Sequence, residues 1–195
     1  MISINEILKP DFDWEKLKID DEQFDELCAD LIIDFLKKNT PKERQLLALS
    51  WNFDNSKKVI KWIIDQKDTD KGTILYLYWY MDPIFYKDNY ANRKECEIEN
   101  SWTLEDYDII ATIEKNYISD YYKEQIYGFN PKKDLYSEGY DWTERYDENK
   151  VKSKIPYKLF EPLNGEFLEA PDWEEGIPTE ISEIMDKLCE AVDEE

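Results

Sequence analysis

The sequence predicts a mainly α-helical protein whose C-terminal region is punctuated by prolines and partly irregular. Two observations support this fold class. Apolar residues recur at steps of three and four over several segments of the 195-residue chain, and helix-start signals precede several of those segments. An apolar fraction of 42% suffices for a packed core. The length fits one domain of ordinary size, or two small ones.

The N-terminal third predicts three helices. The first covers Asp21 to Asn39, where the apolar residues form one stripe and the acids lie off it. Thr40-Pro41, with an acid in the first turn, begins a second helix that reaches Trp51. A third helix runs from about Ser56 to Gln66. The stripe of the first helix comprises Phe24, Leu27, Cys28, Leu31, Ile32, Phe35 and Leu36.

The segment from Ile74 to Met81 is eight consecutive large apolar or aromatic residues. Periodicity does not distinguish a buried strand from a buried helix in such a run. The β-branched and aromatic content favours a strand, whereas the helical neighbours and the single glycine before the run favour a helix. We interpret the segment as a helix.

A further helix is predicted to begin at Thr103, because Asp106 three residues later completes a pattern that resembles a capping box. Apolar and aromatic residues continue at helical spacing from Tyr107 to Ile126, and Gly128 follows as a helix-ending residue.

Residues 129–178 read as an arm or a set of loops, with short strands expected around Tyr157–Phe160 and Gly165–Leu168. A last helix follows Thr179. We therefore expect a helical domain at residues 1–128, and an arm with an acidic helix at 129–195 that packs on the same domain.

The charge balance excludes several function classes. Twenty-five basic and 46 acidic residues give a formal charge of −21, and the last 35 residues hold 13 acids against Lys187 alone. Such a field repels nucleic acid and anionic membranes and attracts basic partners. No apolar run approaches the roughly 20 residues of a membrane span, and the N-terminus lacks the features of a signal peptide. We expect a cytoplasmic protein with three reduced thiols, two of them, Cys28 and Cys189, on apolar helix faces.

Missing residue types exclude most catalytic machinery. The chain has no histidine, which removes histidine-based triads, histidine metal sites and the commonest general acid–base residue. No glycine-rich phosphate loop is present. We therefore expect no cofactor, no metal and no enzymatic activity.

The segment Asp68-Thr-Asp-Lys-Gly-Thr73 allows three interpretations. It faintly resembles the two-aspartate nucleophile motif of haloacid-dehalogenase phosphatases, with Asp68 and Asp70 as the pair. A calcium loop fits poorly, because taking Gly72 as the invariant glycine places Lys67 at the first ligand position. The third interpretation, which we prefer, is a turn in which Asp70 or Thr73 caps the next helix.

Two acidic-aromatic clusters in the irregular region are candidate partner-binding residues. Rings supply buried area and carboxylates supply complementarity to a basic partner. The alternative for each cluster is a tryptophan that packs into the core from a loop, with solvated acids around it. With two acids of the last helix, the predicted contact residues are Tyr140, Asp141, Trp142, Asp172, Trp173, Glu174, Glu175, Glu180 and Glu183.

Residues 46–83 resemble a bacterial family known as domain of unknown function 4274. The resemblance rests on the run from Leu47 to Asp54, Leu-Ala-Leu-Ser-Trp-Asn-Phe-Asp, and on Asp-Lys-Gly-Thr at residues 70–73. Ile74-Leu75 replaces the Ala-Leu that usually follows in the family. Members resemble immunity proteins that neutralise bacterial toxins, and no catalytic residues come with the family. The resemblance implies fold-specifying roles for Trp51, Asn52, Asp70, Gly72 and Thr73, and residues beyond Pro83 lie outside it.

These observations lead to one principal hypothesis and two alternatives. The principal one is an acidic immunity protein that neutralises a bacterial antagonistic toxin by occluding its basic active-site surface, without contacting nucleic acid or membrane itself. Nucleases are the natural basic targets among such toxins. The first alternative is a DNA mimic or regulatory binder of a basic nucleic-acid-binding protein. The second is a carboxylate-based, phosphatase-like enzyme that uses Asp68 and Asp70.

Overall fold

The computed structural model describes residues 2–192, except for the side chain of Glu175. The chain folds into two compact units. The first unit combines the chain up to Trp62 with the chain from Ala170 onwards, and the second comprises Ile63–Glu169. The predicted division at 128/129 does not coincide with these units, because the chain returns after Glu169 to the unit in which it began.

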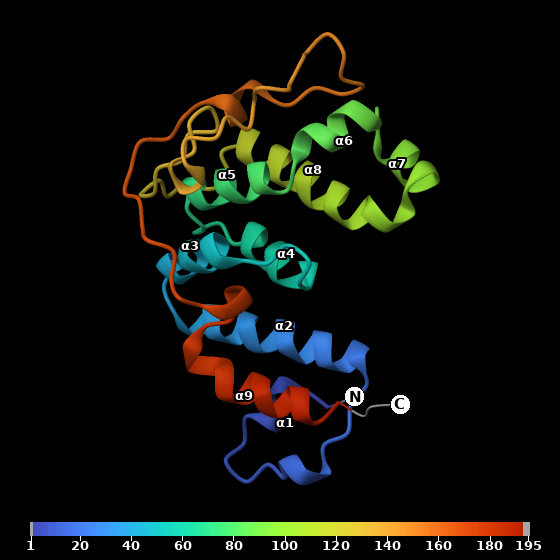
Figure 1. The fold of residues 1–195 in the computed structure, drawn as a ribbon, viewed down its shortest axis with the longest axis vertical. Helices are drawn as coiled ribbons and strands as arrows, with labels where there is room; N and C mark the ends of the chain where they lie inside the picture. Colours follow the sequence, from blue (N-terminus) through green and yellow to red (C-terminus); the bar gives the residue numbers. More distant parts are fainter. Residues whose placement is uncertain (1, 193–195) are drawn as a thin grey trace. The chain divides into compact units, whose positions relative to one another are not determined.

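The first unit is built from helices at both ends of the sequence. In Figure 1 the long helix α2 lies beside α9, and an isolated parallel bridge joins Ile19 to Val192. The first and last parts of the chain therefore share one core. The helices of this unit are α1 (Ile4–Ile7), α2 (Asp21–Lys38), α3 (Pro41–Ser50), the larger part of α4 (Lys57–Asp65) and α9 (Thr179–Glu190).

Local signals in the sequence account for where these helices begin. Asp20 caps α2, because its Oδ1 accepts a hydrogen bond from the backbone N–H of Gln23 at 2.8 Å. The predicted helix start at Thr40-Pro41 is confirmed, and Thr40 forms a capping box with Glu43, in which the Thr40 backbone N–H donates to Glu43 Oε2 at 3.0 Å. The predicted bounds of α2, α3 and α4 are each confirmed to within one or two residues.

The second unit is centred on α5 (Lys71–Tyr80), in which every residue from Gly72 to Trp79 is buried. A helix buried on all sides has no polar face, which is why the sequence of this segment shows no helical period. The helix interpretation of residues 74–81 is confirmed. Helix α8 lies beside α5 in Figure 1. The other helices are α6 (Pro83–Asn89), α7 (Arg93–Glu99) and α8 (Leu104–Ile118), and the sequence analysis did not predict α6 and α7.

The predicted start of the helix at Thr103 is confirmed, because Thr103 is the N-cap residue of α8, whereas the expected capping box and the predicted end at Ile126 are wrong. Thr103 makes no cap hydrogen bond, and its Oγ1 donates instead to the Asn100 carbonyl at 3.0 Å. Helix α8 ends at Ile118, and Asp120 has a positive φ of 53°, which a continuing helix does not allow. The tyrosines beyond it keep helical spacing without being helical.

The irregular region contains isolated bridges in place of the expected short strands. Tyr157–Phe160 forms a 3₁₀ turn, and the segment Gly165–Leu168 contributes one bridge, between Glu166 and Tyr127. In the part of the chain that the structure describes, β pairing is limited to such single bridges. The mainly α fold class is confirmed.

The three cysteines are free thiols in different environments. Cys96 is buried and Cys28 is half-buried, whereas Cys189 is exposed, which corrects the expectation that it lies on the apolar face of its helix. Within residues 2–192, no helix combines the length and the apolar character that crossing a membrane requires.

Candidate partner-binding site

An acidic groove of about 540 Å³ lies in the first unit. Two of its carboxylates, those of Asp172 and Glu174, come from the segment before α9, and a third, that of Asp186, comes from α9 itself. Apolar and hydroxyl side chains complete the wall. We define the acidic groove by its lining residues, Asp172, Glu174, Ile177, Thr179, Ser182, Met185 and Asp186.

The helical period of α9 places its acidic side chains and its apolar side chains on opposite sides of the helix. Glu180, Glu183 and Asp186 are three residues apart and all exposed, so they share the outer side of the helix. Asp186 lines the acidic groove, whereas Glu180 and Glu183 do not. Sequence reasoning missed Asp186, although its spacing from the two predicted acids was the signal that could have identified it. The opposite side of α9 is buried through Ile181, Met185 and Leu188.

The predicted residue Trp173 anchors the segment that carries two of the groove acids. Its ring packs edge-to-face on Phe35 of α2, with ring centroids 6.0 Å apart. Trp173 is half-buried, whereas its neighbours Asp172 and Glu174 are exposed. The side chain of Glu175, another predicted contact residue, lies outside the described part of the chain. Packing of the indole therefore holds the two flanking carboxylates at the surface.

The second predicted cluster, Tyr140 to Trp142, lies in the second unit. The Asp141 carboxylate accepts hydrogen bonds from the backbone and hydroxyl of Thr143, at 2.8 and 2.7 Å. The Trp142 indole N–H donates to Asp134 Oδ2 at 2.9 Å. Tyr140 is 52% exposed. These contacts agree with the alternative in which Trp142 packs inward from a loop, and they leave Tyr140 as the exposed ring of the cluster.

Asp134 organises this loop from a fully buried position. Its Oδ2 also accepts a hydrogen bond from the Tyr80 hydroxyl at 2.9 Å, and its Oδ1 accepts one from the backbone N–H of Tyr136 at 2.8 Å. A carboxylate that accepts several hydrogen bonds stabilises the loop around it. Beside it lies a hollow of about 170 Å³ with an ion pair between Asp82 and Arg145, lined by Trp79, Asp82, Pro83, Ile84, Tyr140, Trp142 and Arg145.

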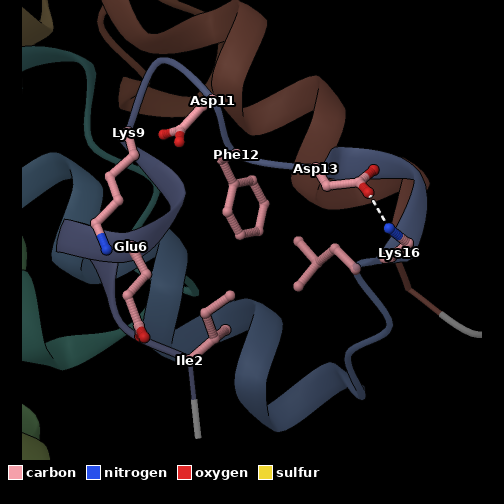
Figure 2. A pocket seen from close by; sticks show the side chains of 8 residues that line it. Ile2, Glu6, Lys9, Asp11, Phe12, Asp13 and Lys16 are labelled. Atoms are coloured by element: carbon pink, nitrogen blue, oxygen red, sulfur yellow. Dashed lines mark ion pairs between the residues drawn. The ribbon is translucent and has the colours of Figure 1, made fainter.

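A further hollow, of about 410 Å³, lies near the N-terminus of the first unit. Figure 2 shows the Phe12 ring at its centre, with Glu6 and Lys9 on one side and the ion pair of Asp13 with Lys16, 2.5 Å long, on the other. Its charged side chains are exposed and of both signs, so the hollow favours neither cations nor anions. The lining residues are Ile2, Glu6, Lys9, Asp11, Phe12, Asp13, Lys16 and Leu17.

The Asp70 carboxylate caps α5, as the preferred interpretation of its segment predicts. It also binds the backbone at Ile126 and Tyr127, which was not predicted, and we call this arrangement the Asp70 clamp. Asp70 is 1% exposed, and its Oδ1 accepts hydrogen bonds from the backbone N–H groups of Gly72 at 2.7 Å and Tyr127 at 3.3 Å. Its other oxygen accepts one from Ile126 N–H. Burial raises the pKa of Asp70, and these backbone hydrogen bonds oppose that rise. Both oxygens of this carboxylate therefore bind the backbone.

Comparison with known proteins identifies one family. The model of Domain of unknown function (DUF4274) matches residues 39–118. The match confirms the resemblance found in the sequence and extends it in both directions, because it begins before Leu46 and continues beyond Pro83 through residues 84–118. No curated protein and no solved structure gives a significant match to the chain.

Proposed function

We propose that this chain, with its DUF4274 match at residues 39–118, is an acidic cytoplasmic immunity protein that binds a bacterial antagonistic toxin. Its mechanism is occlusion. The acidic groove covers a basic, functional surface of the toxin and thereby keeps the toxin from its substrate. The observation that carries the proposal is the convergence of Asp172, Glu174 and Asp186 on a groove with apolar walls.

The groove combines the two properties that a tight interface with a basic partner needs. Ile177 and Met185 offer apolar surface that a partner side chain can bury. The three carboxylates offer complementarity to lysine and arginine and raise the rate of association. The C-terminal segment of the same unit gives the field the same negative sign, since residues 170–195 hold ten acids and one lysine.

The position of Lys187 leaves this field largely uncompensated at the groove. Its ammonium lies 5.6 Å from the centre of the Trp14 ring. Lys187 is not among the residues that line the acidic groove. The negative potential of the groove therefore comes from carboxylates that no lining cation offsets.

Affinity capture followed by a neutralisation assay tests the proposal. The purified protein serves as bait for lysates of related bacteria, at about 50 mM and about 500 mM salt, because screening separates charge-driven from apolar binding. We expect one basic polypeptide at low salt, less of it at high salt, and loss of its toxicity when the two chains are co-expressed. Retention of many nucleic-acid-binding proteins would instead support a DNA mimic. Retention of none, or undiminished toxicity, would contradict the proposal.

A further inference from the structure

A corner of the second unit exposes two large apolar side chains. Helix α7 ends at Glu99, the backbone leaves the helical conformation at Asn100, and a 3₁₀ turn over Ser101–Thr103 packs against α7 before α8 begins. Ile98 is 73% exposed there, and Trp102 is 80% exposed. We define the Trp102 corner by its exposed side chains, Glu97, Ile98, Glu99, Trp102 and Glu105.

Hydrogen bonds inside the unit fix the backbone that carries these two side chains. The Asn100 backbone N–H donates to the Cys96 carbonyl at 2.8 Å, and the backbone N–H and Oγ1 of Thr103 both donate to the Asn100 carbonyl at 3.0 Å. Cys96 is fully buried and Thr103 is 3% exposed. The fold therefore holds Ile98 and Trp102 outward on an anchored backbone. A surface that is ordered before binding loses little conformational entropy when a partner covers it.

Acidic side chains surround the exposed pair. Glu97 and Glu99, the neighbours of the exposed isoleucine, are both exposed. Glu105, in the first turn of α8, is exposed as well. Residues 93–106 hold five acids against two cations, and one of these cations, Arg93, is bound by a carboxylate of α8 at 2.8 and 2.9 Å. The potential at the corner is therefore negative, which favours a cationic partner over an acidic one.

The composition of the corner argues against two other occupants. A second copy would bring the same net charge of −21, so the two chains repel each other. One isoleucine and one tryptophan also offer far less than the roughly 800 Å² that each partner buries in a stable dimer. An anionic membrane surface is repelled by the same acids. Tryptophan is highly buried on average in folded proteins, so an indole held rigidly in solvent indicates a surface that a partner covers.

We propose that the Trp102 corner binds a segment of a partner protein, other than the toxin, in which an arginine lies next to an aliphatic residue. The guanidinium stacks on the face of the Trp102 indole, which attracts a cation, and donates hydrogen bonds to the neighbouring acids. The aliphatic residue covers Ile98. Arginine fits this surface better than lysine, because its planar group stacks on a ring and donates in pairs to a carboxylate. Tryptophan and arginine are also the residues that most often dominate the free energy of an interface.

Peptide titrations of the ¹⁵N-labelled full chain test this assignment at about 150 mM salt, without the toxin. Acetyl-Arg-Leu-Ala-Arg-amide carries the proposed chemistry, acetyl-Lys-Leu-Ala-Lys-amide keeps its charge, and acetyl-Glu-Leu-Ala-Glu-amide reverses that charge. The readout is the indole N–H resonance of Trp102 in NMR spectra, assigned with Trp102→Phe. We expect the arginine peptide to bind at least about threefold more tightly than the lysine peptide. The acidic peptide should leave the resonance unmoved.

Matched charge variants separate the corner from the overall charge of the protein. Glu97→Gln, Glu99→Gln and Glu105→Gln together remove three charges at the corner, and we expect them to weaken binding of the arginine peptide about tenfold. Glu124→Gln, Glu144→Gln and Glu166→Gln make the same change at exposed acids on other segments of the second unit. Screening by salt should limit their effect to less than about twofold.

Four results would overturn the proposal. Three of them come from the titrations: a Trp102 resonance that does not move, equal affinity for the arginine and lysine peptides, or equal losses in the two triple variants. The fourth comes from analytical ultracentrifugation of the free chain. A dimer that Trp102→Ser converts to a monomer would assign the corner to a second copy of the chain.

Discussion

Replacing Gly72 by alanine tests how the Asp70 clamp holds the second unit together. Gly72 is the second residue of α5, and a Cβ placed on it would lie 2.4 Å from the carbonyl oxygen of Tyr127 and 2.8 Å from its carbonyl carbon. Real Cβ atoms do not approach backbone this closely, so the segment around Tyr127 must move. The same segment donates the hydrogen bonds that the Asp70 carboxylate accepts.

Effects of opposite sign determine how much Gly72→Ala changes the free energy of unfolding. Helix propensity favours alanine over glycine by at most about 1 kcal/mol. Overpacking in a well-packed region costs about 1–3 kcal/mol, and disturbing a hydrogen bond to a charged group costs about 1.5–3 kcal/mol. We therefore expect the variant to lose roughly 1.5–5 kcal/mol of unfolding free energy, even though it removes a glycine from a helix.

Urea denaturation, followed by tryptophan fluorescence, measures this loss. Lys71→Ala is the matched control, because it changes the neighbouring residue of the same helix without a clash, and its effect should stay within about 0.5 kcal/mol. Hydrogen exchange adds a local readout, since the amides of Ile126 and Tyr127 should exchange faster in Gly72→Ala. A variant as stable as the wild type, with unchanged exchange at both amides, would refute the reasoning.

Three further predictions concern buried polar groups and a thiol. Lys87→Met should cost roughly 2–4 kcal/mol in denaturant unfolding, because it leaves the half-buried carboxylate of Glu114, 2.8 Å from the Lys87 ammonium, without its cation. A loss below about 1 kcal/mol would contradict this. Asp134→Ala should lower the melting temperature by removing the acceptor of three hydrogen bonds, and an unchanged melting temperature would argue against an organising role. Burial raises the pKa of Cys28 to about 12, so its thiolate fraction at pH 9 should be about a thousandth. Alkylation followed by mass spectrometry should therefore show that Cys28 reacts far more slowly than exposed Cys189. The rate of Cys28 alkylation should still rise above pH 10. Equal rates at pH 9 would disprove that shift.

The sequence predicted helices where one face is buried and one is solvated. Asp21–Lys38 and Thr179–Glu190 show the helical period because their acids face solvent, and Thr40 marks the start of α3 through a local hydrogen bond. Helical spacing of apolar and aromatic residues continues beyond Ile118, but there the side chains make tertiary contacts and the backbone is not helical. The hydroxyl of Tyr122 donates to the Ile64 carbonyl at 2.7 Å, a partner 58 residues away that no local pattern reveals.

The candidate site was predicted in part. Asp172 and Glu174 were identified because acids beside a tryptophan stand out in a proline-rich segment, and the structure places both on the acidic groove. Trp142 has the same sequence context, yet its N–H is bound to buried Asp134, which lies eight residues earlier. The cavity of about 260 Å³ that Trp51 lines was not predicted, since its walls come from three segments that only the fold brings together.

The affinity of two charge-reversal variants for the captured toxin tests the central claim most directly. Asp172→Lys, Glu174→Lys and Asp186→Lys together reverse the acidic groove, whereas Glu99→Lys, Glu124→Lys and Glu144→Lys reverse three exposed acids of the second unit. Each triple variant adds six positive charge units and changes the net charge from −21 to −15.

Surface plasmon resonance at fixed salt, on variants whose melting temperatures match that of the wild type, separates local from overall charge. We expect the groove variant to bind at least about 100-fold more weakly, and the control variant to change less than about threefold, because complementarity at the contact exceeds the screened field of charges outside it. Equal losses in the two variants, or full affinity in the groove variant, would contradict the account.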